Sequence, residues 1–381
     1  MKYSMFCVAL LASLPAWGAD AAQWKIQYFY DVLHETLAIE DLAFPSAQRG
    51  IAVGSILDDT GKKPRYTALI TSDGGAHWTP EPVKEHPRSI FFLDDATGWM
   101  VTDESIWFSN ESGLDWQKVS EQKKPEKKIG PVPHGGLITQ VWFLDRQHGF
   151  AVGYQKTAFE THDGGKSWTP IAAAAEPSAN ASHAEYTQIS FEGQKYGVIV
   201  GGSVLPRPDD PKVPAWMEPE RATRRRPAPA ETIMIETHDG GKTWKPSTAA
   251  LFGSVISLHL RGLTGLAVFS FSEAFEWPSE VYKLDLSTGK SERVFREKDR
   301  RVTDCELYPG PRAYLAAVEP PGQLNTSPIP GKVKILASSN LTDWTEMNVD
   351  YKANARSLLL AGPDADHLWA ATDTGMILHL Q

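Results

Sequence analysis

The chain has 381 residues, too many for one small core and suited to a large repeat fold. Hydrophobic residues make up 41% and charged residues 22%, which is the composition of an ordinary globular protein. The formal net charge of −9 argues against general nucleic-acid binding, because that function needs a basic surface.

The N-terminal segment has the pattern of an export signal. Lys2 gives a positive start, residues 5–14 form a short apolar run, and small residues at 16–18 and 19–21 have cleavage spacing. A buried N-terminal strand is the alternative. The apolar run is too short to cross a membrane, and no other stretch is long enough. We therefore predict a signal peptide over residues 1–22 and a periplasmic or secreted mature domain, not membrane-spanning, over residues 23–381.

Internal repeats dominate the mature chain. An Asp-Gly-Gly motif that begins with Thr and ends with Trp occurs at residues 71–78, 161–168 and 237–244. A weaker copy covers 109–116, and degenerate copies occur at 286–290 and before Trp344. A short β-type run precedes each copy, such as Gly-Phe-Ala-Val-Gly at 149–153, and another apolar run lies before that. Four-strand units that repeat at about 40–50 residues are typical of β-propellers.

The repeat count predicts an all-β fold, namely a seven-bladed β-propeller of four-stranded blades. The last unit stops at its third strand, residues 376–380, so we expect residues 24–30 to add the fourth strand and close the ring. Trp24 would then occupy the place of the repeat Trp, and the closure would cover two sheet edges. The predicted blades span 40–84, 87–120, 136–172, 184–248, 252–297, 300–350 and 354–381, with a Pro-rich insertion at about 204–230.

The Asp-Gly-Gly motif has local structural chemistry. Its Asp carboxylate accepts backbone N–H groups and closes a turn, its glycines supply positive φ, and its Trp packs between blades. Structural rather than catalytic roles are therefore assigned to Asp73, Gly75, Trp78, Asp163, Gly165, Trp168, Asp239, Gly241 and Trp244. His162 and His238 lie inside these turns and are explained by the repeat, so neither a metal site nor a cofactor is predicted.

The sequence contains two cysteines, of which only Cys305 is expected in the mature protein. Cys7 lies in the signal segment and lacks the small preceding residues of a lipid-attachment site. Cleavage leaves Cys305 without an internal disulfide partner. Because Cys305 lies in a strand-like run, 302–308, we expect a buried and inert thiol.

The run at 149–153 together with the motif at 161–168 resembles the BNR/Asp-box propellers, and looks most like the photosystem II stability/assembly factor family. The resemblance covers nearly the whole mature chain. It implies an exported, seven-bladed, non-catalytic propeller. Such a protein would bind a protein or peptide partner and assist the assembly or stability of a membrane-protein complex.

Sialidases share the Asp box, so a sialidase-type glycoside hydrolase is the alternative. A resemblance to sialidases would imply an arginine triad, and the candidates in this chain are Arg88, Arg301 and Arg356. Tyr351 lies close to Arg356 in sequence. The Phe-Arg-Ile-Pro segment of sialidases is absent, and the sequence contains no Gly-x-Ser-x-Gly, His-Glu-x-x-His or P-loop motif. The sequence therefore favours a binding protein.

Loop lengths distinguish the two faces of the expected propeller. The Asp-box turns share one face with the short turns between first and second strands. The opposite face carries the two-to-three loops and the links between blades. These connections are long at 58–65, 120–135, 203–230, 272–280 and 319–331. Elaborate loops on one face of a rigid scaffold favour binding there.

The expected binding residues are arginines and aromatics on the elaborated face. Arg88, Arg301 and Arg356 open the first strands of blades two, six and seven, where they would rim the mouth of the central channel. Phe275, Trp277 and Trp216 lie in the long loops. These residue types are enriched at binding hot spots, and arginines suit an acidic peptide or a chain-terminal carboxylate. We expect a monomer.

Overall fold

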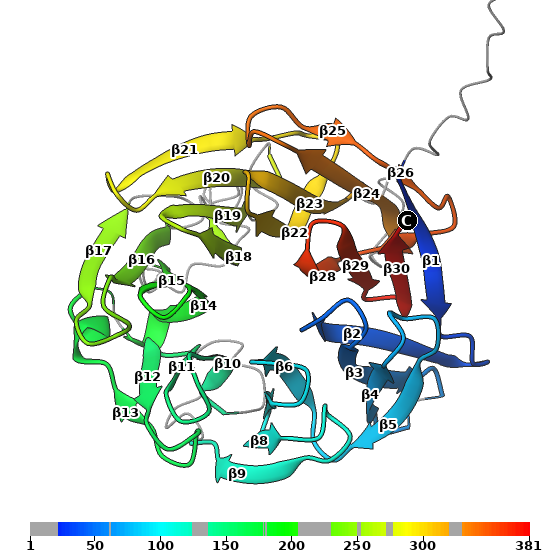
Figure 1. Ribbon diagram of the computed structural model, residues 1–381, viewed down its shortest axis with the longest axis horizontal. Coiled ribbons are helices and arrows are strands. Elements are labelled where there is room, and N and C mark those ends of the chain that lie inside the picture. The colour runs from blue at the N-terminus through cyan, green and yellow to red at the C-terminus, as the bar shows by residue number, and fades with distance from the viewer. Residues whose placement is uncertain are drawn as a thin grey trace, which may run out of the picture.

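The strands form a closed ring of blades around a central axis (Figure 1). The computed structural model describes residues 22–60, 62–123, 136–177, 179, 181–204, 230–249, 253–271, 277–319 and 330–381. Within these residues there are seven sheets, each with an antiparallel four-stranded core. This confirms the predicted all-β, seven-bladed propeller. The signal segment, the body of the 204–230 insertion, Trp216 and Phe275 lie outside the described residues.

The first three blades each consist of four consecutive strands, in the order of the chain. Blade one contains β2 (Glu35–Ala43), β3 (Gly50–Asp58), β4 (Arg65–Thr71) and β5 (Thr79–Val83). Blade two contains β6 (Pro87–Phe92), β7 (Gly98–Thr102), β8 (Ser105–Ser109) and β9 (Gln117–Glu121). Blade three contains β10 (Ile138–Phe143), β11 (Gly149–Gly153), β12 (Thr157–Thr161) and β13 (Thr169–Pro170). Blade one starts before the predicted residue 40, because Leu37 is buried against blade seven.

The next three blades have the same order, and two short 3-10 helices, η1 (Ala172–Ala175) and η2 (Ala181–His183), precede blade four. Blade four contains β14 (Ala184–Glu192), β15 (Tyr196–Val204), β16 (Ala230–Thr237) and β17 (Lys245–Ala249). Blade five contains β18 (Ser254–Arg261), β19 (Thr264–Ser270), β20 (Ser279–Asp285) and β21 (Lys290–Phe295). Blade six contains β22 (Arg301–Tyr308), β23 (Arg312–Val318), β24 (Gly331–Ser338) and β25 (Thr345–Glu346), with β27 (Asn354–Ala355) beside β24.

Blade seven joins the two ends of the chain. Its first three strands are β28 (Leu358–Asp364), β29 (His367–Thr372) and β30 (Met376–Leu380), and its fourth is β1 (Gln23–Phe29). β1 runs antiparallel to β30, with Trp24 opposite Leu380, and its outer edge pairs with β26 (Asn348–Val349). The predicted closure by the N-terminal strand is therefore confirmed. The helices in the described part of the chain are neither long nor apolar enough to cross a membrane.

The hydrophobic cores lie between neighbouring blades. Trp78 packs edge-on against Phe44 in the core shared by blades seven and one, and Trp168 occupies the same position between blades two and three. Trp24 is fully buried in the core shared by blades six and seven. It fills the groove that an Asp-box Trp of blade seven would fill. Cys305 is also buried, as expected, and burial raises the pKa of its thiol.

The three full Asp boxes have one hydrogen-bond pattern. In blade three, the Thr161 hydroxyl accepts the N–H of Gly165 (3.0 Å) and donates to Oδ1 of Asp163 (2.8 Å). The same oxygen of Asp163 accepts the N–H of Ser167 (2.9 Å), and Oδ2 accepts the Ser167 hydroxyl (2.5 Å). The hydroxyl of Ser167 has the largest part in lowering the pKa of Asp163 to about 2, followed by the N–H of Ser167 and the Thr161 hydroxyl. The second glycine has a positive φ in each box: 85° at Gly75, 91° at Gly165 and 90° at Gly241. These are the contacts that a local structural role requires.

Replacing Asp163 with alanine should lower the free energy of unfolding by about 1–2 kcal/mol, because the turn loses its side-chain hydrogen bonds. Chemical denaturation measures the loss, and Asp163→Asn, which keeps an acceptor for the Ser167 N–H, should recover part of it. Partner binding by the folded variant should be unchanged. Unchanged stability combined with lost binding would mean that the Asp box contacts the partner.

Candidate functional site

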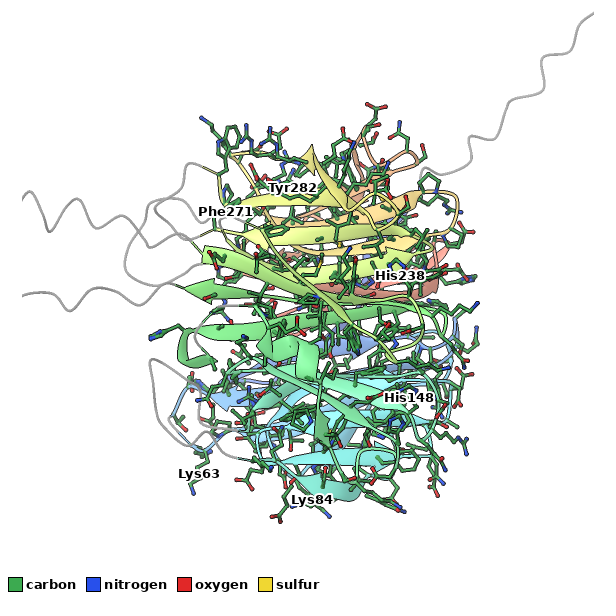
Figure 2. The ribbon with its side chains drawn as sticks, turned by 90° about the vertical axis from the view of Figure 1, so that its left-hand side faces the viewer. Lys63, Lys84, His148, His238, Phe271 and Tyr282 are labelled. Atoms are coloured by element: carbon green, nitrogen blue, oxygen red, sulfur yellow. The ribbon has the colours of Figure 1, made fainter. Side chains whose placement is uncertain are left out.

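Hydrogen bonds between turns define the two faces of the ring. The N–H of Gly74 donates to the carbonyl of Gln48 (2.9 Å), and the N–H of Gly164 donates to that of Gln147 (3.0 Å). The Asp boxes and the one-to-two turns therefore share one face, here called the Asp-box face. The opposite face, with the two-to-three turns and the links between blades, is called the loop face. Lys63 and Phe271 lie on the loop side in Figure 2, and His148 and His238 on the other side.

A central cavity of about 750 Å³ is lined by the first strands of the blades. Its ionisable lining residues are Glu40, Asp41, Arg88, His259, Arg261, Asp304 and Glu306. First strands run from the loop face to the Asp-box face, so Arg88 lies near the loop-face mouth and Arg261 near the opposite mouth. Most of the ionisable lining groups are acidic, which the sequence analysis did not anticipate.

The acidic residues of the channel connect one blade to the next. Asp41 accepts the backbone N–H of Ile90 in blade two (2.8 Å), and Asp304 accepts that of Leu360 in blade seven (2.7 Å). The first strands are irregular at these points, because their register with the second strand shifts just before Asp41 and Asp304. A bulge of this kind re-aims side chains, here toward the first strand of the next blade.

Burial controls the charge of these channel groups. It raises the pKa of Asp41 to about 7 and that of Asp304 to about 6, against the opposing effect of their backbone hydrogen bonds. Glu306 lies 3.2 Å from Nδ1 of His259. Burial raises the pKa of Glu306 and lowers that of His259 to about 4, which favours a neutral pair. The channel therefore holds less negative charge than its carboxyl count implies.

The three strand-opening arginines form two separate groups. Nε of Arg88 bonds to Asp103, and its guanidinium lies 5.5 Å from the ring of Tyr154. Arg356 is ion-paired with Asp373 (2.7 Å), and Arg301 donates to the carbonyl of Arg356.

Both aspartates lie in two-to-three turns, as the loop face requires. Blade one separates Arg88 from blade seven, and β6 lies across the ring from β22 and β28 (Figure 1). Arg88 lines the cavity, whereas its described lining includes neither Arg301 nor Arg356. The hydrogen bond of Arg301 to a carbonyl leaves its positive charge unneutralised by that contact.

Trp277 lies in a cationic setting on the loop face. The guanidinium of Arg296 lies 4.1 Å from its ring centroid, and the ammonium of Lys298 lies 4.8 Å away. Arg296 is also ion-paired with the largely buried Glu280 (3.0 Å), which accepts a hydrogen bond from Tyr282. We call Trp277, Arg296, Lys298 and Glu280 the Trp277 cluster. It combines an aromatic surface with two cations, the chemistry that suits an acidic or aromatic peptide segment.

Sequence reasoning missed most of the lining of the channel. The available signal was charge within otherwise apolar first strands, as in Ala-Ile-Glu-Asp-Leu at 38–42 and Thr-Asp-Cys-Glu-Leu at 303–307. It also missed that Asp103 and Asp373 neutralise two of the three candidate arginines. Both aspartates follow a second strand directly, so the expected antiparallel turn would have placed them next to the opening of the first strand.

Comparisons with known proteins agree with this architecture. A family model described as photosynthesis system II assembly factor YCF48 matches residues 125–208, which include blade three. The photosystem II assembly protein Ycf48 of Thermosynechococcus vestitus is 26% identical over 264 residues, covering 65% of this chain and 70% of that protein.

Solved structures show the same fold at low sequence identity. YCF48 bound to a D1 peptide has a TM-score of 0.55 at 15% identity and covers 92% of this chain and 98% of that one. YCF48 from Cyanidioschyzon merolae has a TM-score of 0.55 at 12% identity and covers 94% and 98%. At these identities the likeness is one of fold.

Proposed function

Because this chain is a seven-bladed Asp-box propeller that resembles the photosystem II stability/assembly factors, we propose that it is an exported, non-catalytic binding protein. Its loop face holds a peptide segment of a protein partner and so assists the assembly or stability of a membrane-protein complex. The monomer is the binding unit. Export rests on the signal pattern at residues 1–22.

The observation that carries this proposal is the chemistry of the loop face. Arg301 donates a hydrogen bond to the carbonyl of Arg356, a contact that does not neutralise its positive charge. The Trp277 cluster adds an aromatic ring with two cations. Arg301 is exposed and Trp277 is half-buried, and arginine and tryptophan are enriched among the residues that contribute most to binding at protein interfaces. A related structure contains YCF48 with a D1 peptide, which supports a peptide as the ligand class.

The sialidase alternative requires three arginines that converge on one substrate carboxylate. In this chain Arg88 and Arg356 are each bonded to an aspartate, and blade one separates them. Tyr351 is 79% exposed and lies in the link after β26, outside the described lining of the channel. This arrangement favours binding over glycoside hydrolysis.

The proposal predicts that Arg301→Ala weakens partner binding by about tenfold, because a charge-assisted hydrogen bond is lost. Partners are cross-linked to the protein in its own cell envelope and identified by mass spectrometry, and their segments are then titrated as labelled peptides. Binding should also weaken with added salt. The matched control is Lys166→Ala, which removes a cation from an Asp box on the opposite face.

Three results would contradict the proposal. Arg301→Ala could bind as tightly as the wild type while Lys166→Ala loses affinity, which would place the partner on the Asp-box face. Release of sialic acid from a fluorogenic glycoside by the wild type would show an enzyme. Recovery of the protein from the cytoplasm with residues 1–22 intact would contradict export.

A further inference from the structure

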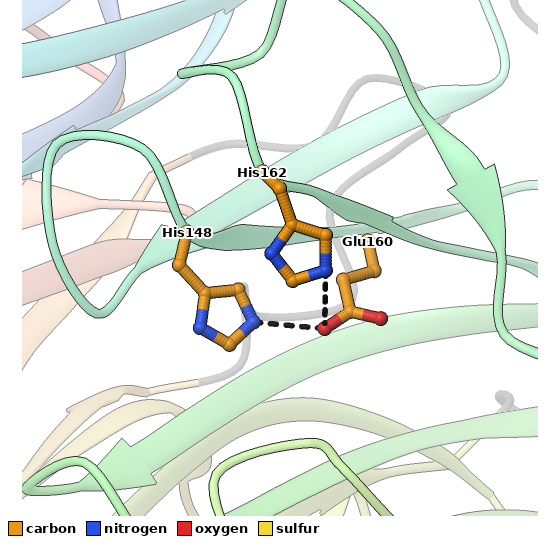
Figure 3. Close-up of side chains that lie close together, drawn as sticks. All are labelled: His148, Glu160 and His162. Carbon is orange, nitrogen blue, oxygen red and sulfur yellow. Dashed lines mark hydrogen bonds and ion pairs between the residues drawn. The ribbon is translucent and has the colours of Figure 1, made fainter.

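A group of two histidines and a glutamate lies on the Asp-box face of blade three. His148 ends the one-to-two turn, Glu160 lies in β12, and His162 lies in the Asp box (Figure 3). The sheet register pairs Gly149 with Thr161, so His148 and His162 are cross-strand neighbours. In the sequence, His162 is explained by the repeat alone, because the register between β11 and β12 that brings His148 beside it cannot be read from the sequence.

The three side chains point their ligand atoms at one place. Oε1 of Glu160 lies 2.8 Å from Nε2 of His148 and 3.4 Å from Nε2 of His162, and all three ligand atoms lie within 4.8 Å of one another. The two imidazole rings are stacked, with centroids 4.7 Å apart. Two ligands about 2.1 Å from a tetrahedral metal are about 3.4 Å apart, so small side-chain rotations would seat an ion here.

The surroundings suit a cation that keeps open coordination positions. The imidazole of His162 is 72% exposed, whereas His148 and Glu160 are about three-quarters buried, at 22% and 25% exposure. The buried ring of Phe150 lies 5.0 Å from that of His148 and limits its movement. Asp145 accepts the N–H of His148 (2.8 Å), and this bond is the largest of the effects that lower its pKa, so its carboxylate adds a second negative charge.

Blade four shows that the repeat does not by itself require this group. It has the same Asp box, with Glu236 and His238 in the places of Glu160 and His162. Tyr196 occupies the place of His148, and its ring packs edge-on against His238 at 5.4 Å. Glu236 is paired with Lys245 instead. At the three ligand positions, blade three therefore differs from blade four in one residue, His148, which completes the set of metal ligands.

We propose that His148, Glu160 and His162 form a binding site for a divalent transition-metal ion such as Zn²⁺. Two imidazoles and a carboxylate are ligands that Zn²⁺ takes readily, and three protein ligands leave a position for water or for a side chain of a partner. The site lies on the face opposite the proposed peptide surface. A test of metal binding therefore does not depend on whether the loop face binds a peptide.

Isothermal titration of the protein, purified without a polyhistidine tag, with Zn²⁺ tests this site. The wild type should bind one equivalent, and Zn²⁺ should raise its melting temperature, because an ion that binds only the folded state stabilises it. His162→Gln should weaken binding by at least about tenfold. Because His162 is exposed, this variant should fold normally, as its melting temperature without metal will show.

Two further variants locate the ion. His148→Tyr copies blade four and should also lose the bound equivalent, whereas His238→Gln changes the equivalent histidine of blade four and should bind Zn²⁺ as the wild type does. The proposal is overturned if the wild type gives no binding heat. It is also overturned if His162→Gln binds with wild-type affinity, or if His238→Gln loses the ion as His162→Gln does.

Discussion

Replacing Trp24 with alanine is expected to lower the free energy of unfolding by about 3–5 kcal/mol, because a large and fully buried side chain leaves a cavity between blades six and seven. The side chain is also hydrogen-bonded to the sulfur of Met347 across that groove (3.4 Å). Trp24 holds the N-terminal strand β1 in the core between blades six and seven, so its loss should weaken the closure of the ring. Urea denaturation monitored by circular dichroism measures the change.

The control for this variant lies in the same strand. Phe29 is 51% exposed, and Phe29→Ala should change the free energy of unfolding by less than about 0.5 kcal/mol. Deleting residues 23–29 should have a larger effect than Trp24→Ala, since it uncovers an edge of β30 and one of β26 and promotes association. A monomeric deletion protein with an unchanged melting temperature would contradict closure by β1.

The second large effect is a pH dependence that originates in the channel. The pKa of Asp41 is raised to about 7, whereas an unfolded aspartate has a pKa of about 3.9. Between these values the folded state keeps the proton that the unfolded state releases, so this contribution to stability falls as the pH rises. The free energy of unfolding of the wild type minus that of Asp41→Asn should therefore fall by about 2–3 kcal/mol from pH 5 to pH 8.

A second carboxyl group provides the comparison. The pKa of Asp304 is raised to about 6, so the difference between the wild type and Asp304→Asn should fall in the same direction, by less, and should level off at a lower pH. Comparing variants at each pH removes the opposite contribution of His259, whose pKa is lowered to about 4. A difference that stays constant or grows with pH would mean that Asp41 is ionised in the folded channel.

The sequence was sufficient to predict the architecture, because a propeller repeats its own pattern. Each Asp box marks the turn between the third and fourth strands, so the absence of a strand after residues 376–380 indicated that Trp24 and its neighbours complete the ring. The weaker repeats also keep part of this chemistry. In blade six, Ser338 takes the part of the Asp-box Thr, and Leu341 has a positive φ of 64° where glycine usually lies.

The candidate sites were less predictable, because they depend on register and on contacts between blades. The sequence placed Arg88, Arg301 and Arg356 at strand openings, but only the folded structure shows the bonds that Arg88 and Arg356 make to aspartates. A strand bulge directs Asp41 toward the first strand of the next blade, and bulges have no clear signal in a single sequence. The meeting of His148 with His162 likewise requires the register of β11 with β12.

Hydrogen exchange of the protein with and without a captured partner peptide maps the binding surface without any substitution. If the loop face holds the peptide, exchange should slow in the loop-face segments around Asp103, Trp277 and Asp373 and stay unchanged in the Asp-box turns. Slower exchange confined to the Asp-box turns, with none on the loop face, would contradict binding at the loop face.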